Sequence, residues 1–292
     1  MNTLDTQWAW PWWAALVTVN VVNVALCAHY YRQSVRAPDG DSVYLQRMRI
    51  MGLIFTLVAL YRSIFVSRYL YQYAWFDTFA NSSLLIRTFA WAAELSFSGL
   101  IALAMLKFTA DMPHTPLRVN RLSSLYRTKG PYILVACIFF AQFFATGGLI
   151  TKSRLLFAIE ETLWTAGFLS ILPLAALQFR QAFATKQVAL DPGLSMLKTF
   201  SAVNLGWCVI YCSYGLVYHL PTEYWASAVQ QMQTGVPEIR TGSAAVTDAL
   251  TIVNVTHSYS DWGFGFVFWH SAYFSICVWL AIFLMRGPRK LS

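Results

Sequence analysis

The chain has 292 residues, of which 57% are hydrophobic and only 12% are charged, and its mean hydropathy is +0.49. Soluble domains carry about 25% charged residues, so this composition excludes an ordinary soluble protein and predicts a polytopic membrane protein. The net charge of +8 does not indicate nucleic-acid binding, because the basic residues gather in a few segments between apolar runs.

Seven apolar segments are each long enough to cross a bilayer as a helix, which takes about 20 residues. They show no alternating strand pattern, and isolated strands cannot cross lipid. The sequence therefore predicts an all-α fold, with residues 1–292 forming one transmembrane domain built as a bundle of seven transmembrane helices. The predicted spans are 8–30, 50–72, 83–106, 131–150, 155–178, 199–220 and 262–285.

The ends and connections of these spans differ in charge. The first seven residues lack the basic start of a signal peptide, so we expect 8–30 to remain as the first helix. Four segments carry most of the 21 basic residues: 31–49, 107–130, 179–198 and 286–292. The positive-inside rule then predicts an external N-terminus and a cytoplasmic C-terminus. We expect a multi-pass protein of the plasma (inner) membrane.

The second and third spans contain charges that lipid disfavours: Arg62, Arg68, Arg87 and Glu94. A charge near the bilayer centre costs at least about 2.5–3.5 kcal/mol. Arg62 lies twelve residues into the predicted second span and Glu94 eleven into the third, so at ~1.5 Å per residue both fall near the midplane. We therefore predict an Arg62–Glu94 ion pair, with Arg87 on the same helix face as Glu94.

Two interpretations fit this charged group. An ion pair that only fixes helix packing explains Arg62 and Glu94, and Arg68 near the rim can extend its charge to the membrane surface. Alternatively, the arginines hold an anionic group while the carboxylate orients it or transfers a proton. Three arginines exceed what one carboxylate needs, which favours the second interpretation.

The fifth span carries two adjacent carboxylates, Glu160 and Glu161. Neighbouring residues on a helix point about 100° apart, so only one of them is expected to face the bundle. An acid pair at the membrane surface explains them without function. A carboxylate that faces the bundle is instead a candidate proton donor or metal ligand. The spacing does not decide which of the two faces inward, and we take Glu161 as the site candidate.

The long segment 221–261 is predicted as an outer loop, either a lid over a site or a loosely ordered connection. His257 and Asp261 lie at its end, and His270 follows inside the seventh span. Histidines that converge with Glu94 and Glu161 would suit a divalent metal. No pair of them has metal-ligand spacing, so the cofactor stays open.

The sequence lacks the motifs that define several other classes of protein. No lysine lies within a central span, which excludes a retinal Schiff base, and there is no phosphate-binding loop, dinucleotide fingerprint or serine nucleophile motif. The five cysteines lie in apolar runs without paired spacing, so we expect them to pack as small side chains.

These observations predict a polar cavity in the outer half of the bundle. Its catalytic candidates are Glu94, Glu161 and His270, and its substrate-binding candidates are Arg62, Arg68, Arg87, His257 and Asp261. The function we expect is that of a membrane enzyme acting on a lipid-like or anionic substrate by acid–base chemistry. A transporter or channel for a small anion or proton-coupled solute is one alternative, and a non-catalytic subunit or assembly factor of a membrane complex is another. The predicted partners are the bilayer and a lipid or anionic small molecule, not nucleic acid; the oligomeric state is open.

Overall fold

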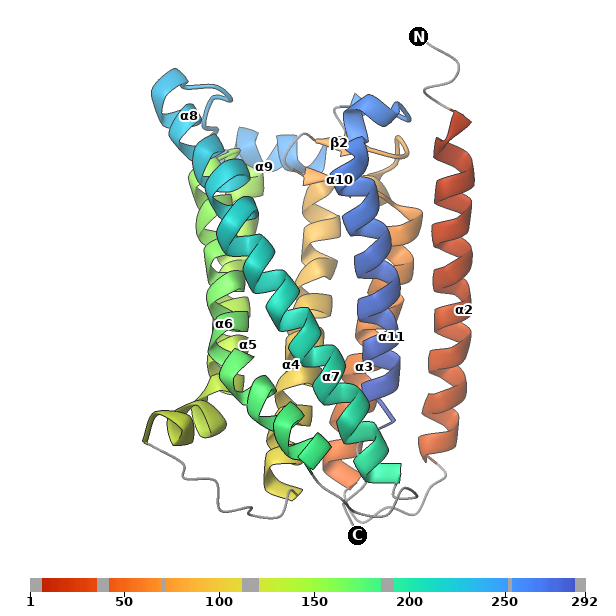
Figure 1. Cartoon of the computed structure of the whole chain (residues 1–292). Coiled ribbons are helices and arrows are strands. Elements are labelled where there is room, and N and C mark those ends of the chain that lie inside the picture. Colours follow the sequence, from red (N-terminus) through yellow and green to blue (C-terminus); the bar gives the residue numbers. More distant parts are fainter. Residues whose placement is uncertain are drawn as a thin grey trace. The chain divides into compact units, whose positions relative to one another are not determined.

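The computed structural model describes residues 7–35, 42–69, 72–111, 121–184, 192–251 and 254–286. Helices dominate this part of the chain, and seven helical spans are long and apolar enough to cross a membrane (Figure 1). The predicted all-α class with seven membrane helices is confirmed, and the chain has the shape of an integral membrane protein. The orientation of its termini stays a prediction, and parts of all four basic segments lie outside the described residues.

The first five long helices are α2 (Ala9–Val35), α3 (Ser42–Ile64), α4 (Ser83–Asp111), α5 (Arg121–Thr151) and α6 (Arg154–Ala184). The sixth span joins α7 (Pro192–Tyr214), the π-helical segment η3 (Gly215–Trp225) and α8 (Ala226–Thr234). The seventh joins α10 (Tyr259–Ala272), the π-helical segment η4 (Tyr273–Cys277) and α11 (Val278–Leu284). The short elements are β1 (Ser67–Arg68), β2 (Tyr73–Ala74), the 3-10 turn η2 (Phe79–Asn81), α9 (Gly242–Leu250) and β3 (Asn254–Val255).

Two predicted boundaries differ from the structure. The span expected at 50–72 is α3, which begins at Ser42 and ends at Ile64. After it, Val66 packs in an aromatic core, and Ser67 and Arg68 form β1 instead of another helical turn. The segment expected as a loop at 221–261 is largely helical. Its amphipathic start continues the sixth span as η3 and α8, and α9 lies in its second half.

The chain divides into two compact units, each described by itself. Unit 1 comprises Met1–Phe97, Thr146–Ser153 and Pro237–Arg286. Unit 2 comprises Ser98–Ala145, Arg154–Val236 and Gly287–Ser292. The prediction of one continuous domain is not tested by this division and stays a prediction.

In unit 1, α2 packs against α3 and α11, although α2 and α11 lie at opposite ends of the sequence (Figure 1). Polar side chains join these helices. Asn20 donates a hydrogen bond to the Ser63 hydroxyl (2.9 Å), and the Trp279 indole donates to the side-chain amide oxygen of Asn23 (3.0 Å). Hydrogen bonds between helices stabilise packing in lipid, where apolar contact alone gives little preference.

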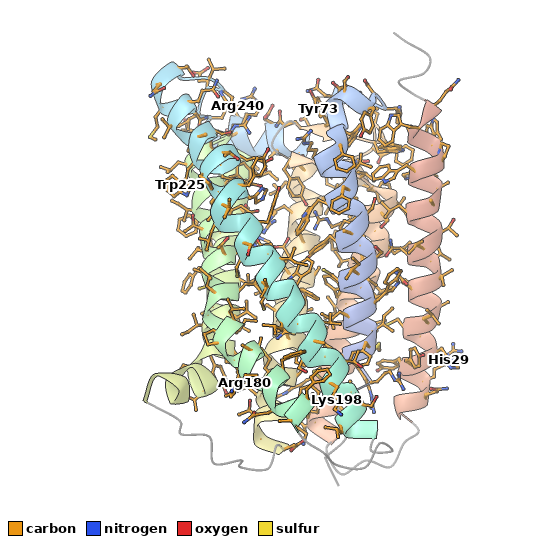
Figure 2. The ribbon with its side chains drawn as sticks, in the orientation of Figure 1. His29, Tyr73, Arg180, Lys198, Trp225 and Arg240 are labelled. Atoms are coloured by element: carbon orange, nitrogen blue, oxygen red, sulfur yellow. The ribbon has the colours of Figure 1, made fainter. Side chains whose placement is uncertain are left out.

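A three-stranded sheet fixes one end of unit 1. β1 pairs antiparallel with β2, and β2 pairs parallel with β3, so Tyr73 lies opposite both Arg68 and Asn254. This sheet ties the connection after α3 to the segment that precedes α10. Figure 2 shows Tyr73 and Arg240 at this end of unit 1 and His29 of α2 near the other.

Helix α10 is interrupted by Gly263, which has φ 71° and ψ 155°. The break leaves carbonyls of the first turn without helical partners, because a helical carbonyl bonds to the amide four residues later. Arg68 of β1 supplies the missing hydrogen-bond donors. Its guanidinium donates to the carbonyl oxygens of Asp261 and Trp262, both at 2.8 Å.

Gly263→Ala should destabilise the protein by about 1–3 kcal/mol, because only glycine adopts this backbone conformation without strain. The measurement is thermal unfolding in detergent. Gly265→Ala is the matched control, since a Cβ at Gly265 meets nothing within 4 Å. Equal melting temperatures for the wild type and Gly263→Ala would contradict the assignment of strain to this position.

Asp248 of α9 holds together three connections of unit 1. Its carboxylate lies 2.9 Å from the Lys152 ammonium, accepts a hydrogen bond from Gln72 (3.1 Å) and pairs with Arg240. Lys152 also donates to the Gln72 side-chain oxygen (2.8 Å). Partial burial raises the pKa of Asp248, but hydrogen bonds from Lys152 and Gln72 and the attraction of Lys152 outweigh it, so the pKa is lowered overall.

A carboxylate with a lowered pKa stabilises the folded state above its unfolded pKa, and the contribution disappears as the pH falls through the lower folded value. The wild type should therefore lose protection of α9 from hydrogen exchange below about pH 4. Asp248→Asn should show weak protection at neutral pH and lack this acid-dependent step. Glu238→Gln, a matched change at an exposed side chain, should behave like the wild type. If Asp248→Asn lost protection of α9 at the same acidic pH, a group other than Asp248 would cause that loss.

In unit 2, α6 packs along α7, η3 and α8. The packing is close at glycine positions: a Cβ on Gly215 would lie 2.9 Å from the Thr165 hydroxyl, and one on Gly130 would lie 2.7 Å from a backbone oxygen of α6. Figure 2 shows Trp225 at one end of this unit and Arg180 and Lys198 at the other. All five cysteines of the chain are free thiols.

Candidate functional site

The charged residues predicted from the second, third and seventh spans meet in unit 1. We call the group of Arg62, Arg87, Glu94, His270 and Tyr273 the polar centre. Arg62 comes from the last turn of α3, Arg87 and Glu94 from α4, and the other two from α10 and η4. Arg62 lies two residues before the end of α3, whereas we expected it midway along its helix.

Glu94 and Arg87 form the closest ion pair of the polar centre. Two guanidinium nitrogens of Arg87 donate to the two carboxylate oxygens of Glu94, at 3.1 and 3.3 Å. Both side chains are almost fully buried, with 4% and 8% of their surfaces exposed. Residues seven apart share a helix face, and an arginine side chain is long enough to span the two turns between them. This bidentate geometry is the strong form of a charge-assisted hydrogen bond.

The predicted Arg62–Glu94 pair is present but longer. One guanidinium nitrogen of Arg62 lies 3.9 Å from a Glu94 oxygen, beyond hydrogen-bond distance. Aromatic faces hold the rest of the group: the guanidinium carbon lies 5.1 Å from the Phe274 ring centroid and 5.7 Å from that of Tyr69. Among the residues that the structure describes, no oxygen accepts a hydrogen bond from the Arg62 guanidinium.

His270 is buried beside Arg62. Its ring stacks on Phe266 with centroids 4.9 Å apart and meets Phe274 edge-on at 4.5 Å. Its Nε2 atom is fully covered and has no hydrogen-bond partner in the described part of the chain. A buried polar atom without a partner is uncommon and calls for a physical reason.

Tyr273 was not among the residues predicted for a site. Its ring lies against Phe55 and Phe97, at 5.9 and 6.5 Å between centroids, and its hydroxyl is close enough to Glu94 and Arg62 to interact electrostatically. The hydroxyl is buried and makes no hydrogen bond within the described residues. The signal that was available is its three-residue spacing from His270, which places both on one helix face.

The other predicted binding residues of unit 1 have structural partners. Arg68 caps the interrupted turn of α10, and the Asp261 carboxylate accepts a hydrogen bond from Thr256. His257 lies between Trp10 and Trp75, with ring centroids 5.0 and 4.9 Å away, and its Nε2 is 3.1 Å from the Trp75 carbonyl oxygen. A role for these three in substrate binding stays a prediction.

Glu161 belongs to unit 2, where it meets different partners from those expected. The Tyr211 hydroxyl donates to it at 3.4 Å, and His219 Nε2 lies 3.8 Å away. The other ring nitrogen of His219 is 2.6 Å from Glu223. The adjacent Glu160 is buried, with 6% of its surface exposed. Both neighbouring carboxylates are therefore in protein surroundings, and η3 supplies the histidine between Glu161 and Glu223.

A metal site was left open by the sequence. Across the described ranges of the chain, no group of three histidine, cysteine, aspartate or glutamate side chains is arranged to hold a metal ion.

No protein-family model, curated protein or solved structure matches the chain.

The two arginines of the polar centre should differ in their effect on stability. Arg87→Gln breaks a buried bidentate pair and should cost about 3 kcal/mol. Arg62→Gln should cost less than Arg87→Gln, because it removes a longer ion pair and leaves the Arg87–Glu94 pair electrically balanced. Chemical unfolding in mixed micelles measures both, with the exposed Arg180→Gln as the matched control. Equal losses at Arg62 and Arg87 would contradict this division of roles.

Proposed function

We propose that the chain is an integral membrane enzyme that acts on a lipid-like or anionic substrate by acid–base chemistry at the polar centre. The single observation that carries this proposal is the imidazole of His270. It is buried beside an ionised network, and its Nε2 has no protein partner among the described residues. Such an atom, with the Arg62 guanidinium and the imidazole both against the Phe274 ring, is suited to exchange a proton with a bound molecule.

The charge balance of the polar centre supports an anionic substrate. Glu94 is the one acidic residue in the interior of a long helix in the described part of unit 1, and it faces two arginines. Removing a net positive charge from water is costly unless a negative charge accompanies it. An anionic group near Arg62 would supply that charge. Arg62 would then bind the substrate, while Arg87 fixes Glu94.

The two proton-transfer groups have distinct surroundings. Glu94 accepts two charge-assisted hydrogen bonds from Arg87. His270 is enclosed by aromatic rings. A pair of titratable groups in such different surroundings is typical of acid–base sites. In this proposal His270 exchanges the proton and Glu94 stabilises the charge that develops, while Glu161 belongs to a separate group.

The proposal includes placement in a plasma (inner) membrane with the N-terminus outside and the C-terminus in the cytoplasm. Its support is the sequence distribution of lysine and arginine. In unit 2, Arg180 and Lys198 lie together at the end opposite Trp225, as one basic side requires (Figure 2). Protease access to a C-terminal tag in sealed vesicles tests the orientation, and cleavage from the external side alone would overturn it.

The enzymatic proposal is tested by turnover. Wild-type protein in nanodiscs of defined lipid classes is incubated, and the lipids are followed by mass spectrometry. One anionic class should be converted, and His270→Phe should slow conversion at least about 100-fold, since general acid–base groups contribute 10²–10⁴-fold. Phenylalanine preserves the ring packing, so the protein should remain folded.

His29→Phe is the matched control, because His29 is exposed on α2 and lies outside the polar centre. It should convert lipid at the wild-type rate. Glu94→Asp keeps the charge but shortens the side chain, and it should also slow conversion. Unchanged lipid in every class with the wild type, or a wild-type rate in His270→Phe, would overturn the enzymatic proposal.

A further inference from the structure

The sixth span runs as one continuous helix from α7 to α8 (Figure 1), but its hydrogen-bond register changes over η3. Gly215 begins this π-helical segment and Trp225 ends it, and the amide of Ala226 still donates to the Pro221 carbonyl five residues earlier. π-Helical geometry occurs mostly as single turns within α-helices and often marks a functional position. Eleven residues in this geometry therefore need specific side-chain contacts that hold them in place.

The ring of His219 makes two contacts that depend on the π-helical spacing. Its centroid lies 4.9 Å from that of Tyr214 and 4.8 Å from that of Tyr224, each five residues away along the chain. In an α-helix, at about 100° per residue, residues five apart point about 140° away from each other, so these rings would lie on different faces. A π-helix forms its hydrogen bonds between residues five apart, which brings the three rings into line. The ring of His219 thus stabilises η3 in the π-helical register.

Two carboxylates flank the same imidazole. Nδ1 of His219 lies 2.6 Å from a Glu223 oxygen, and Nε2 lies 3.8 Å from an oxygen of Glu161 on α6. A protonated imidazole places a positive charge between them, whereas a neutral one leaves the two negative charges to repel each other. The exposed fraction of the side chain is 22% for His219 and 46% for Glu223, so protons from water have access to this pair. η3 also carries the phenol of Tyr218, which is half exposed.

The elements packed against η3 are α6, α7 and α8. α6 contributes Glu161, the adjacent buried Glu160 and, two turns before Glu161, Arg154. α7 contributes the Tyr211 hydroxyl, which donates to Glu161 at 3.4 Å, and α8 carries no ionisable side chain. Histidine is the side chain whose unperturbed charge changes between pH 5 and 8, and His219 is the histidine of this group.

The register of η3 decides which side of α8 faces α6. In the π-helical form Ala228 is fully buried, and the Gln231 side-chain oxygen accepts a hydrogen bond from the Arg154 amide (2.7 Å), which caps the start of α6. An α-helix turns further per residue than a π-helix, so converting η3 to an α-helix would rotate α8 by about half a turn. Ala228 and Gln231 would then point away from α6, and its first amide would lose the cap.

We infer that η3 is a pH-sensitive register switch, in which protonated His219 holds the π-helical form and thereby docks α8 on the start of α6. The ion pairs with Glu161 and Glu223 require a charged imidazole, so their stabilising effect is present in acid and is lost as rising pH removes the proton. Without these pairs the α-helical form, which needs no such contacts, becomes the more stable one. The switch lies in unit 2 and is independent of the chemistry proposed for the polar centre.

Two introduced cysteines report the rotation of α8. Ala228 is buried and Gln230 is exposed, and on an α-helix these two positions point about 160° apart. Ala228→Cys and Gln230→Cys are made separately in the intact chain, in nanodiscs, and alkylation by a water-soluble reagent is followed by peptide mass spectrometry at about pH 5.5 and about pH 8. Each rate is divided by that of a small free thiol at the same pH, which removes the effect of pH on the thiolate fraction.

With rising pH, the corrected rate at position 228 should increase at least about fivefold, the size of change expected when partly exposed ion pairs are lost. The corrected rate at position 230 should fall, because rotation turns that side of α8 toward α6. His219→Phe preserves an aromatic ring but cannot carry a charge, so both rates should be independent of pH. His29→Phe, a matched change at an exposed histidine on α2, should respond to pH like the chain without it.

Three outcomes would overturn the switch. The first is a corrected rate at position 228 that stays constant with pH while His219 is present. The second is the same pH response in His219→Phe, which would assign the response to another group. The third is an increase at both positions, because fraying of α8 exposes all of its sides whereas rotation exposes one and covers the other.

Discussion

The buried carboxylate of Glu94 is the interaction on which the arrangement of unit 1 depends. Two buried arginines in an apolar helical protein need a counter-charge. Glu94 supplies this charge, and its bidentate bond with Arg87 lies within the single helix α4. Because that pair is complete on α4, Arg62 approaches Glu94 only to 3.9 Å. The guanidinium of Arg62 therefore retains donor capacity that the rest of the polar centre does not use.

The end of α3 links this electrostatic arrangement to the fold. If α3 continued beyond Ile64, Arg68 would lie within that helix. The chain instead turns into β1, and Arg68 there supports the interrupted start of α10. α10 and η4 carry His270 and Tyr273. The short strand and the glycine break thus position the two groups that accompany the arginines.

The sequence was sufficient for the class of fold and for part of the polar centre. Long apolar runs reveal membrane helices, and the cost of burying charge singles out Arg62, Arg87 and Glu94. It did not reveal the end of α3, because the apolar residues that follow pack in an aromatic core as readily as in a helix. The role of Arg68 depends on a backbone break at Gly263 that periodicity does not show. The sequence could not show that Glu161 and Glu94 belong to different groups, because residue spacing does not give the order of the helices in space.

The central claim is that the polar centre binds an anion through Arg62. The most direct measurement is native mass spectrometry of protein gently extracted from its own membrane, comparing the wild type with Arg62→Gln and Arg180→Gln. We expect an added mass from an anionic compound in the wild type and in Arg180→Gln, and no such mass in Arg62→Gln. The same added mass in all three proteins, or bare chains throughout, would contradict it.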